Sequence, residues 1–439
     1  MWRRGVSVAG VRLRVVKSGR RFRVELTEGQ ARLAEQTADV CRAVWNIGLE
    51  QRREYRRRGA SMNYNEQAHE LREAKQEQTW LKAAPSHCLQ QTLRALDEAC
   101  RRRGTWKVHW RSARRWAPSF RFPEGSQMEL RELNRRKTQV KLPKLGWVKF
   151  RASRSLDGET IRSATLSTEG ERWFVSFVVE DGKTPPAGHA NADTAVGVDR
   201  GVVVAVATST GELRDRAFVT AGERRRALRL QRKLSRAANG SANRSKARAA
   251  LAEVRARERR RRQDFCQKTA HQLAHSNALV VLEKLPAKNM TRHARPAPDP
   301  DNSGRYLPNG AAAKSGLNKA ILSKGWYRFE QALNSVSRYT GTVVVKVPAA
   351  FTSQRCSVCG HVDPKSRESQ AVFRCTHHCS RPAEHADVNA AKNILAAGLA
   401  VTACEDRPRP AGRGRSSKQE PAGNREELLL QPQNAASAA

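Results

Sequence analysis

Three carboxylates of this chain stand at positions where a protein can hold a metal ion. Asp199 follows an apolar run typical of a strand, Glu283 ends another such run, and Asp387 stands where a helical pattern begins. Two Mg²⁺ ions about 4 Å apart need several carboxylates to hold them and to balance their charge. Carboxylates delivered from separate segments of a basic chain therefore indicate metal-dependent cutting of nucleic acid.

Each carboxylate alone also has an ordinary structural interpretation. Asp199 could cap a turn, Glu283 could be a surface charge at a strand end, and Asp387 could N-cap the helix predicted over 388–399. Their order favours the joint interpretation. The order is that of an RNase H-like sheet: a strand ending in Asp, a hairpin partner over 202–207, a later strand ending in Glu, and a last helix opening with Asp. Such a sheet brings carboxylates together at one edge.

Four cysteines between the second and third carboxylates have nearly the spacing of a two-knuckle zinc site. They are Cys356, Cys359, Cys375 and Cys379. Each pair can bind one shared Zn²⁺ as thiolates, and four protein ligands leave no open position for chemistry, so we predict a structural zinc. The second pair encloses three residues instead of two, so His377 and His378 remain alternative ligands.

The net charge restricts the partners of the chain. Its 439 residues include 82 Lys and Arg against 42 Asp and Glu, a net charge of +40. Such a charge opposes compaction unless a polyanion neutralises it. Solubility or a membrane-surface patch is the alternative, but the release of counterions makes nucleic acid the better partner. Basic residues extend from Arg3 to Arg425, which favours a long or wrapped nucleic acid.

The composition predicts a cytoplasmic protein that acts on nucleic acid. No apolar run approaches the roughly 20 residues that a membrane helix needs. The first residues carry no apolar signal-peptide stretch behind their charges. Five cysteines outside the cluster are best interpreted as reduced thiols. They are Cys41, Cys88, Cys100, Cys266 and Cys404.

The first 180 residues read as strands interrupted by helices. Alternating apolar residues predict a hairpin over 11–25 that turns at 17–19. Thr27 and Gln30 form a capping-box pattern at the start of a helical segment over 26–104. Short strands rich in Trp, Phe and Val follow over 105–180. Their alternating aromatic and basic residues could be a surface for stacking bases or the two faces of an antiparallel barrel.

The remainder begins after a Pro- and Gly-containing linker at 181–193. We predict two helices within 223–276, the second rich in Arg; the cations could form a solvated face, but they favour contact with phosphates. A long loop over 292–316 precedes a helix at 318–339 and a strand at 342–347. Residues 404–439 lack apolar periodicity and are predicted to be disordered.

Several of these segments resemble the TnpB proteins of bacterial insertion sequences, compact relatives of type V CRISPR effector nucleases. The segments are 199–201, 281–283, 288–290, 317–319, 352–360 and 386–394. The resemblance is specific over about 195–398 and looser over 20–180. Arg200 stands where many family members have Leu, and the spacing of the second cysteine pair is another departure.

The resemblance implies a multidomain α+β protein with an RNase H-like (RuvC) α/β nuclease domain. Its expected parts are a wedge-like β-barrel over 1–25 and 105–180, a helical recognition segment over 26–104, a nuclease domain over 194–351 and 384–403, and a zinc ribbon over 352–383. Such proteins use RNA from the end of their own element as a guide and cut double-stranded DNA beside a short motif. Asp199, Glu283 and Asp387 would then hold two Mg²⁺.

Two other functions remain as alternatives. A transposase that joins DNA strands itself is one, although no Tyr or Ser nucleophile stands in a recognisable recombinase context. An RNA-guided protein that blocks transcription without cutting is the other, and the complete set of Asp199, Glu283 and Asp387 argues against it. The sequence carries no signal that separates a monomer from a dimer.

Overall fold

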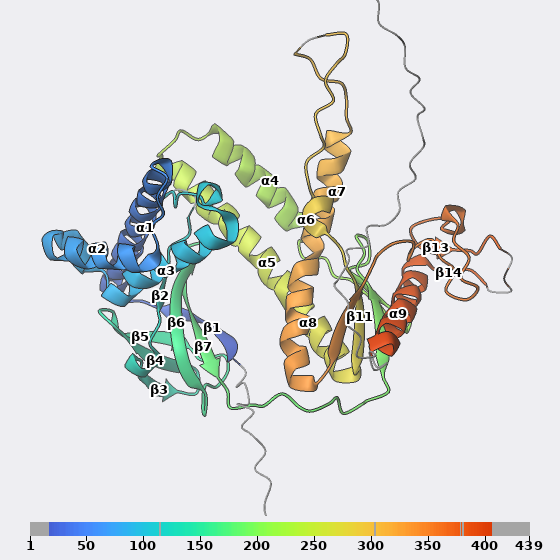
Figure 1. Ribbon diagram of the computed structural model, residues 1–439, viewed down its shortest axis with the longest axis horizontal. Coiled ribbons are helices and arrows are strands. Elements are labelled where there is room, and N and C mark those ends of the chain that lie inside the picture. The colour runs from blue at the N-terminus through green and yellow to red at the C-terminus, as the bar shows by residue number, and fades with distance from the viewer. Residues whose placement is uncertain (1–16, 114–115, 303, 378, 380–381, 406–439) are drawn as a thin grey trace, which may run out of the picture. The chain divides into compact units, whose positions relative to one another are not determined.

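The computed structural model describes residues 17–113, 116–302, 304–377, 379 and 382–405 (Figure 1). Contacts divide the chain into one unit, Met1–Gly398, and a second, Leu399–Ala439. Of the second unit the structure describes only the end of the last helix. The fold is mixed α/β, with a seven-stranded sheet, a five-stranded sheet and a small two-stranded sheet. Disorder is predicted over 404–439, but residues 404 and 405 belong to the last helix; residues 406–439 and those before 17 lie outside the described residues.

The seven-stranded sheet is antiparallel and has the order β2-β6-β7-β1-β5-β4-β3. Its strands are β1 (Lys17–Glu25), β2 (Ser119–Phe122), β3 (Leu130–Asn134), β4 (Lys137–Leu142), β5 (Gly146–Arg151), β6 (Thr160–Glu169) and β7 (Arg172–Glu180). Every second residue of β7 is buried. Phe22, Phe150 and Phe177 pack with ring centroids 5.0 to 6.0 Å apart, so three strands share one aromatic core.

The predicted turn at 17–19 is wrong. Lys17, Ser18 and Gly19 belong to β1 and pair with Glu180, Val179 and Val178 of β7. A distant strand with a matching apolar alternation satisfies their backbone groups, and this outweighs the local turn signal of Gly19. Residues 11–16 of the predicted hairpin lie outside the described residues.

The structure separates the two interpretations of the aromatic residues after 105. Phe120, Phe122 and Trp173 are buried in the core. This is expected if the alternating residues form the two faces of a sheet. Trp106 and Trp110, in contrast, are 56% and 44% exposed, and the Arg53 guanidinium stacks on both rings at 5.8 and 4.9 Å. The alternation therefore builds a core over most of its length and leaves an exposed aromatic pair before it.

Three helices lie between β1 and β2 in the chain: α1 (Glu28–Arg57), α2 (Tyr64–Glu77) and α3 (Ser86–Arg103). The capping box is confirmed, because the Gln30 N–H donates to Thr27 Oγ1 at 3.3 Å and the Thr27 N–H donates to Gln30 Oε1 at 3.1 Å. Leu49, Leu89 and Leu96 are fully buried and join these helices to the aromatic core. The chain also has short 3₁₀ helices: η1 (Thr79–Ala83) within this segment, η2 (Thr105–Lys107) and η3 (Gly125–Gln127) after it, and η4 (Pro364–Ser366) between the cysteine pairs.

The five-stranded sheet has the order β10-β9-β8-β11-β12. Its strands are β8 (Ala195–Asp199), β9 (Val206–Thr208), β10 (Leu213–Arg214), β11 (Leu279–Glu283) and β12 (Val343–Val347). The first three form an antiparallel meander, and β11 and β12 run parallel to β8. Strand β9 begins at Val206, not at the predicted Val202, because residues 202–205 bend instead of pairing.

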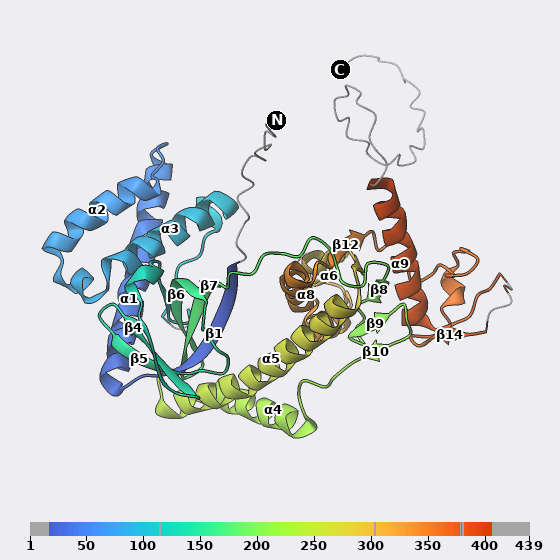
Figure 2. The ribbon, with the colours of Figure 1, turned by 90° about the horizontal axis from the view of Figure 1, so that it is seen from below.

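Helices cover both faces of this sheet (Figure 2). On one face, α5 (Ala242–Ser276) and α8 (Trp326–Thr340) pack on β8 and β11. On the other, α9 (Ala386–Glu405) packs through Ile394 on Val281 and Val347. At Gly197 an added Cβ would lie 2.1 Å from the backbone oxygen of Ala391, so only glycine lets α9 approach β8 this closely. The remaining helices are α4 (Ala221–Arg236), α6 (Ala287–Met290) and α7 (Ala311–Lys324).

The helix predicted over 318–339 is two helices, α7 and α8. They meet at Gly325, whose φ of 78° lies in the left-handed region. A Cβ there would lie 2.8 Å from the Arg262 side chain. Glycine is therefore needed at position 325 for two reasons: the left-handed backbone conformation and the close contact with α5. The long loop is correspondingly shorter than predicted and ends where α7 begins.

Among the described residues, no helix is both long and apolar enough to cross a membrane.

Candidate functional site: a carboxylate cluster and a cysteine cluster

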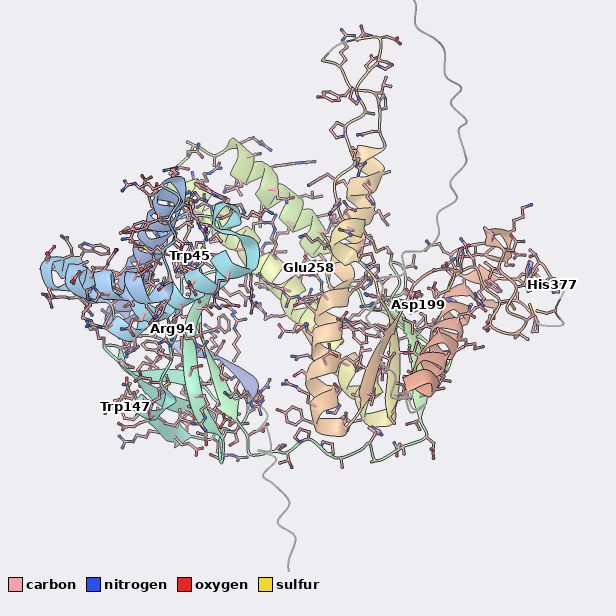
Figure 3. The ribbon with its side chains drawn as sticks, viewed as in Figure 1. Trp45, Arg94, Trp147, Asp199, Glu258 and His377 are labelled. Atoms are coloured by element: carbon pink, nitrogen blue, oxygen red, sulfur yellow. The ribbon has the colours of Figure 1, made fainter. Side chains whose placement is uncertain are left out.

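The fold brings the three predicted carboxylates to one edge of the five-stranded sheet. Asp199 and Glu283 end the neighbouring parallel strands β8 and β11, in which Val198 lies opposite Leu282. Asp387 lies in the first turn of α9, and its Oδ2 is 3.6 Å from the position that a Cβ on Gly201 would take. Figure 3 labels Asp199 among the side chains of this edge. We call these three residues the carboxylate cluster.

The electrostatics of the cluster show that the carboxylates repel one another. Burial raises the pKa of Asp199, the negative charges of Glu283 and Asp387 raise it further, and the value reaches about 7. Burial also raises the pKa of Glu283, against the hydrogen bond from Thr352 and the charge of Arg200. A bound cation would relieve this repulsion, and oxygen-only donors suit Mg²⁺.

The oxygens of the carboxylate cluster are spread more widely than the sulfurs of the cysteine cluster. In the part of the chain that the structure describes, only the four cysteines place three or more metal-ligating atoms within 4.8 Å of one another. Two ions about 4 Å apart are bound by oxygens that need not all be mutual neighbours. The donor set is oxygen-only, as Mg²⁺ prefers, and it comes from three elements that meet at one sheet edge.

Arg367 contacts the carboxylate cluster, and the sequence did not predict this. Its Nη2 lies 2.9 Å from Asp387 Oδ1, and the side chain keeps 28% of its exposed area. It also opposes the rise in the pKa of Asp199. Arg367 is one of several basic residues between the cysteine pairs, and no spacing distinguishes it. Only the folded ribbon shows that this cation reaches the cluster.

Hydrogen bonds orient the Glu283 carboxylate and join α9 to the segment before the cysteine cluster. Thr352 Oγ1 donates to Glu283 Oε1, and the Asn393 side-chain amide donates to the Thr352 carbonyl oxygen at 3.0 Å. Asn389 and Asn393 both donate to the Arg355 carbonyl oxygen, at 2.8 and 2.7 Å. Both asparagines are buried on α9. Helix α9 therefore holds Asp387 and anchors the segment that enters the cysteine cluster.

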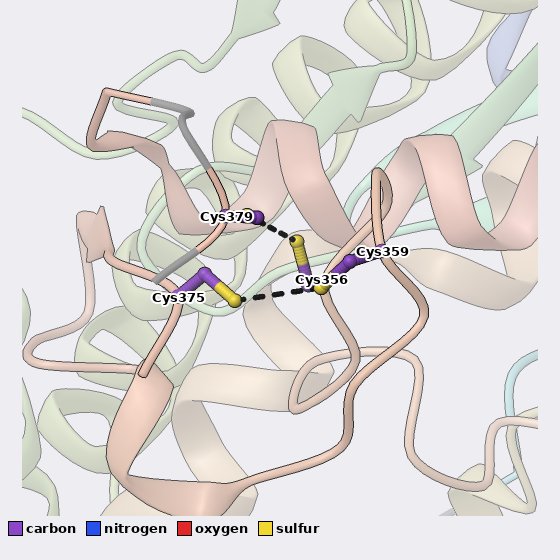
Figure 4. Close-up of side chains that lie close together, drawn as sticks. All are labelled: Cys356, Cys359, Cys375 and Cys379. Carbon is purple, nitrogen blue, oxygen red and sulfur yellow. Dashed lines mark hydrogen bonds between the residues drawn. The ribbon is translucent and has the colours of Figure 1, made fainter. Parts of the chain in front are cut away.

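The cysteine cluster has the geometry of a metal site (Figure 4). Cys356 Sγ lies 3.7 Å from Cys379 Sγ, and Cys359 Sγ lies 3.6 Å from Cys375 Sγ. Four thiolates arranged tetrahedrally at a Zn–S distance of about 2.3 Å stand roughly 3.8 Å apart. The four sulfurs therefore suit Zn²⁺, and they are too far apart to be disulfides.

The local structure favours a thiolate at Cys356, whereas burial and the hydrogen bonds with Cys375 and Cys356 raise the pKa of Cys359. Burial raises the pKa of Cys356, but backbone N–H groups of Cys359 and Val358 and the neighbouring thiols lower it to about 7. The strands β13 (Val372–Phe373) and β14 (Glu384–His385) pair behind the cluster. The exposed His377 ring stacks on His361 at 4.9 Å, and the alternative ligand His378 lies outside the described residues.

Three protein-family models match parts of the chain. The Cas12f1-like TNB domain matches residues 326–394, a probable transposase matches residues 176–294, and a helix-turn-helix domain matches residues 16–61. Within the last range the structure has β1 followed by the single long helix α1. The first two matches cover both clusters: Asp199 and Glu283 lie in the second, and Asp387 with all four cysteines lies in the first.

Curated relatives match nearly the whole chain. The "Putative RNA-guided DNA endonuclease InsQ" of Escherichia coli (strain K12) is 34% identical over 409 residues, which cover 91% of this chain and 96% of that protein. A "Putative RNA-guided DNA endonuclease" of Streptomyces pristinaespiralis is also 34% identical, over 92% of this chain and 96% of that protein. Among solved structures, the Cas12f1 chain of a Cas12f1–sgRNA–target DNA complex shares the fold, with a TM-score of 0.53 and 13% identity over 84% of this chain and 83% of that chain.

Proposed function

This chain belongs to the TnpB family of insertion-sequence proteins, and from that premise we propose that it is an RNA-guided endonuclease that cuts double-stranded DNA. The two relatives named as RNA-guided DNA endonucleases support this function over nearly their full lengths. The observation that carries the proposal is the meeting of Asp199, Glu283 and Asp387 at one sheet edge, where burial and the charges of the other two carboxylates raise the pKa of Asp199.

We assign the five-stranded sheet to a RuvC-like nuclease domain. An antiparallel meander followed by two parallel strands, with the acids at the carboxyl ends of the first and fourth strands in the chain, supports this assignment. The domain would comprise 194–351 and 384–403, with a zinc ribbon over 352–383 between its parts. The seven-stranded sheet would be the wedge-like barrel, and 26–104 the helical recognition segment.

The carboxylate cluster would hold two Mg²⁺. The chemistry that bound Mg²⁺ would supply is activation of a water molecule for attack on the phosphodiester and stabilisation of the leaving 3′ oxygen. Cleavage of this kind would give a product with a 5′ phosphate. Asp199, Glu283 and Asp387 would supply the negative charge that keeps the ions in place. Thr352 donates to one oxygen of Glu283 and so orients that carboxylate. Arg367, which is partly exposed beside Asp387, would bind an oxygen of the DNA phosphate that enters the site.

The remaining parts would bind nucleic acid. The net charge of +40 is suited to an RNA guide and its paired DNA, because phosphates relieve the repulsion among Lys and Arg. The guide would come from the end of the insertion element, and pairing would select the target. The cysteine cluster would bind a structural Zn²⁺, since its four thiols leave no ligand position for substrate.

The decisive experiment combines RNA identification with cleavage. The protein is expressed with the 3′ end of its gene and downstream flank, and the RNA that copurifies is sequenced. A plasmid library that carries the matching target beside randomised flanking DNA is then incubated with the complex and Mg²⁺. Cleavage of matching plasmids supports the proposal. Target binding without any cleavage would favour the repressor alternative, and strand joining without RNA would favour the transposase.

A further inference from the structure

Arg200 is a buried cation directly beside the carboxylate cluster. It follows Asp199 in the chain, and its side chain is only 3% exposed. Burial of a guanidinium is costly unless its donors find partners. The contacts of this side chain therefore indicate what it does.

The two ends of the Arg200 guanidinium contact two different elements. Nη2 donates a hydrogen bond to the backbone carbonyl oxygen of Glu283, at the end of β11. Nη1 lies 3.4 Å from Glu330 Oε2, one turn into α8. Glu330 also forms an ion pair with Lys346 of β12. Because Arg200 is covalently next to Asp199, one side chain joins the ends of β8 and β11 to the helix that covers them.

The junction of α7 and α8 holds the rest of the same loop. The Trp326 indole N–H donates to the Gly201 carbonyl oxygen at 3.2 Å, and Lys324 Nζ donates to the Val203 carbonyl oxygen at 2.6 Å. The left-handed Gly325 between them turns both side chains toward the loop. The loop 200–203 is thus fixed by three side chains: its own Arg200, and Lys324 and Trp326 at the helix junction.

Stability alone does not account for a buried arginine here. Its Nε has no hydrogen-bond partner among the described residues, so the burial of the guanidinium is incompletely compensated. Replacement of a buried ion pair by apolar side chains of similar volume is often neutral or stabilising. A lysine in this position could not donate in two directions from a planar fork. The contacts at this position therefore depend on the planar guanidinium of arginine, which donates in two directions at once.

We propose that Arg200 is a positioning residue of the nuclease site, which fixes the carboxylates of Asp199 and Glu283 at the mutual distance that bound metal requires. The inference rests on the proposed function and goes beyond it, because Arg200 is not one of the three proposed metal ligands and acts through its contacts with Glu283 and Glu330. Groups that orient metal ligands typically change metal affinity or activity by about 10- to 100-fold when they are lost. The geometry assigns that role to Arg200, with Glu330 as the group that orients it.

The test separates positioning from folding with a paired substitution. Arg200→Leu leaves Glu330 short of a partner and can lower stability for that reason alone. The double variant R200L/E330L removes both charges, so its melting temperature should return close to that of the wild type. Cleavage by the double variant should stay about 10- to 100-fold lower, and it should need more Mg²⁺ for half-maximal rate. Arg200→Lys should also fail to restore the rate.

A second readout does not depend on DNA cleavage. Fe²⁺ in place of Mg²⁺, with ascorbate and peroxide, generates hydroxyl radicals that cut the polypeptide beside the bound ion. Mass spectrometry of the RNA-bound complex then reports fragments near residues 199 and 283 as Fe²⁺ is titrated. The Arg200→Leu and double variants should need about 10- to 100-fold more Fe²⁺ for the same fragment yield. The matched control is Arg214→Leu, which removes an arginine paired with Glu212 elsewhere in the same sheet.

Two outcomes separate the inference from the proposed function. If Asp199→Ala abolishes the local fragments and DNA cleavage while the folded double variant behaves as wild type in both assays, Arg200 is not a positioning residue. If Asp199→Ala leaves both unchanged, the site itself is misassigned and the proposed function loses its support. A double variant that melts as wild type and still needs more Fe²⁺ establishes the positioning role.

Discussion

Asp199 and Glu283 leave neighbouring parallel strands at the same edge of the five-stranded sheet, one residue beyond the registered pair Val198 and Leu282. This register places two carboxylates side by side in a partly buried position, and the first turn of α9 adds Asp387. Burial, and then the negative charges of Glu283 and Asp387, raise the pKa of Asp199 to about 7. Bound cations would offset the repulsion in this arrangement.

The first prediction concerns the carboxylates themselves. Asp199→Ala, Glu283→Ala or Asp387→Ala should each lower DNA cleavage by roughly 1,000-fold or more, because several kcal/mol of transition-state stabilisation depend on the bound ions. Guided binding to target DNA should stay nearly unchanged, since it depends on pairing and on contacts to phosphate. A plasmid assay with Mg²⁺ and a gel shift on the same preparations measure both. The exposed Asp193→Ala serves as the control and should cut normally; loss of cutting only through lost binding would overturn the assignment.

Arg367 gives the second prediction. Arg367→Ala should lower cleavage by about 10- to 100-fold, because Asp387 loses its neighbouring cation and the entering phosphate loses a donor. Single-turnover cleavage with saturating guide RNA isolates this effect from target binding. Arg374→Ala is the matched control, since Arg374 lies in the same ribbon but pairs with the exposed Glu368. Equal rates for the two variants would contradict a role for Arg367 in the site.

The third prediction is a pH dependence. The carboxyl of Asp199 has an ordinary pKa of about 3.9 when unfolded and a pKa of about 7 in the fold. The folded protein therefore keeps this proton between pH ~4 and ~7 while the unfolded chain loses it, and stability without metal falls as pH rises through that window. Mg²⁺ should raise the melting temperature more at pH 8 than at pH 5.5. In Asp199→Asn, the loss of stability between pH ~4 and ~7 should be smaller, and Mg²⁺ should raise the melting temperature by more similar amounts at pH 8 and pH 5.5. A variant with the same pH profile as the wild type would show that Asp199 does not titrate in this window.

The fourth prediction concerns the cysteine cluster. Cys356→Ser, Cys359→Ser and Cys379→Ser should each release Zn²⁺ and speed hydrogen exchange over residues 352–377, because the binding energy of a structural zinc is folding energy. Elemental analysis and exchange mass spectrometry measure the two effects. His377→Ala should keep the metal, since the exposed ring stacks on His361. Cys100→Ser, which changes a buried thiol outside the cluster, controls for a general loss of fold. A wild-type preparation without zinc would refute the site.

The fifth prediction concerns RNA. The protein should copurify with RNA and aggregate when the RNA is digested, because the net charge of +40 is relieved only by phosphates. Light scattering before and after nuclease treatment measures this. Target affinity should also fall linearly in a logarithmic plot against salt concentration. A monodisperse RNA-free preparation that cuts target DNA at full rate would contradict the guided mechanism.

The sequence by itself determined the features that depend on near neighbours. The capping box at Thr27 needs only Gln30 three residues later, and the structure contains both of its hydrogen bonds. The cysteine spacing likewise predicted a cluster, and all four sulfurs meet. The apolar runs before Asp199 and Glu283 form strands as predicted, because short runs rich in Val and Leu suit the interior of a sheet covered on both faces.

The tertiary structure alone decided the contacts between distant segments. Lys17 pairs with Glu180 instead of entering a turn, Arg367 reaches Asp387 from the cysteine ribbon, and Arg200 meets Glu330 130 residues away. No local spacing marks these pairs, because each depends on the register of a sheet or the packing of a helix that the whole chain determines. A one-residue change in the register of β8 against β11 would turn Asp199 away from Glu283. The acids of the candidate site are visible in the sequence, and their meeting is a property of the fold.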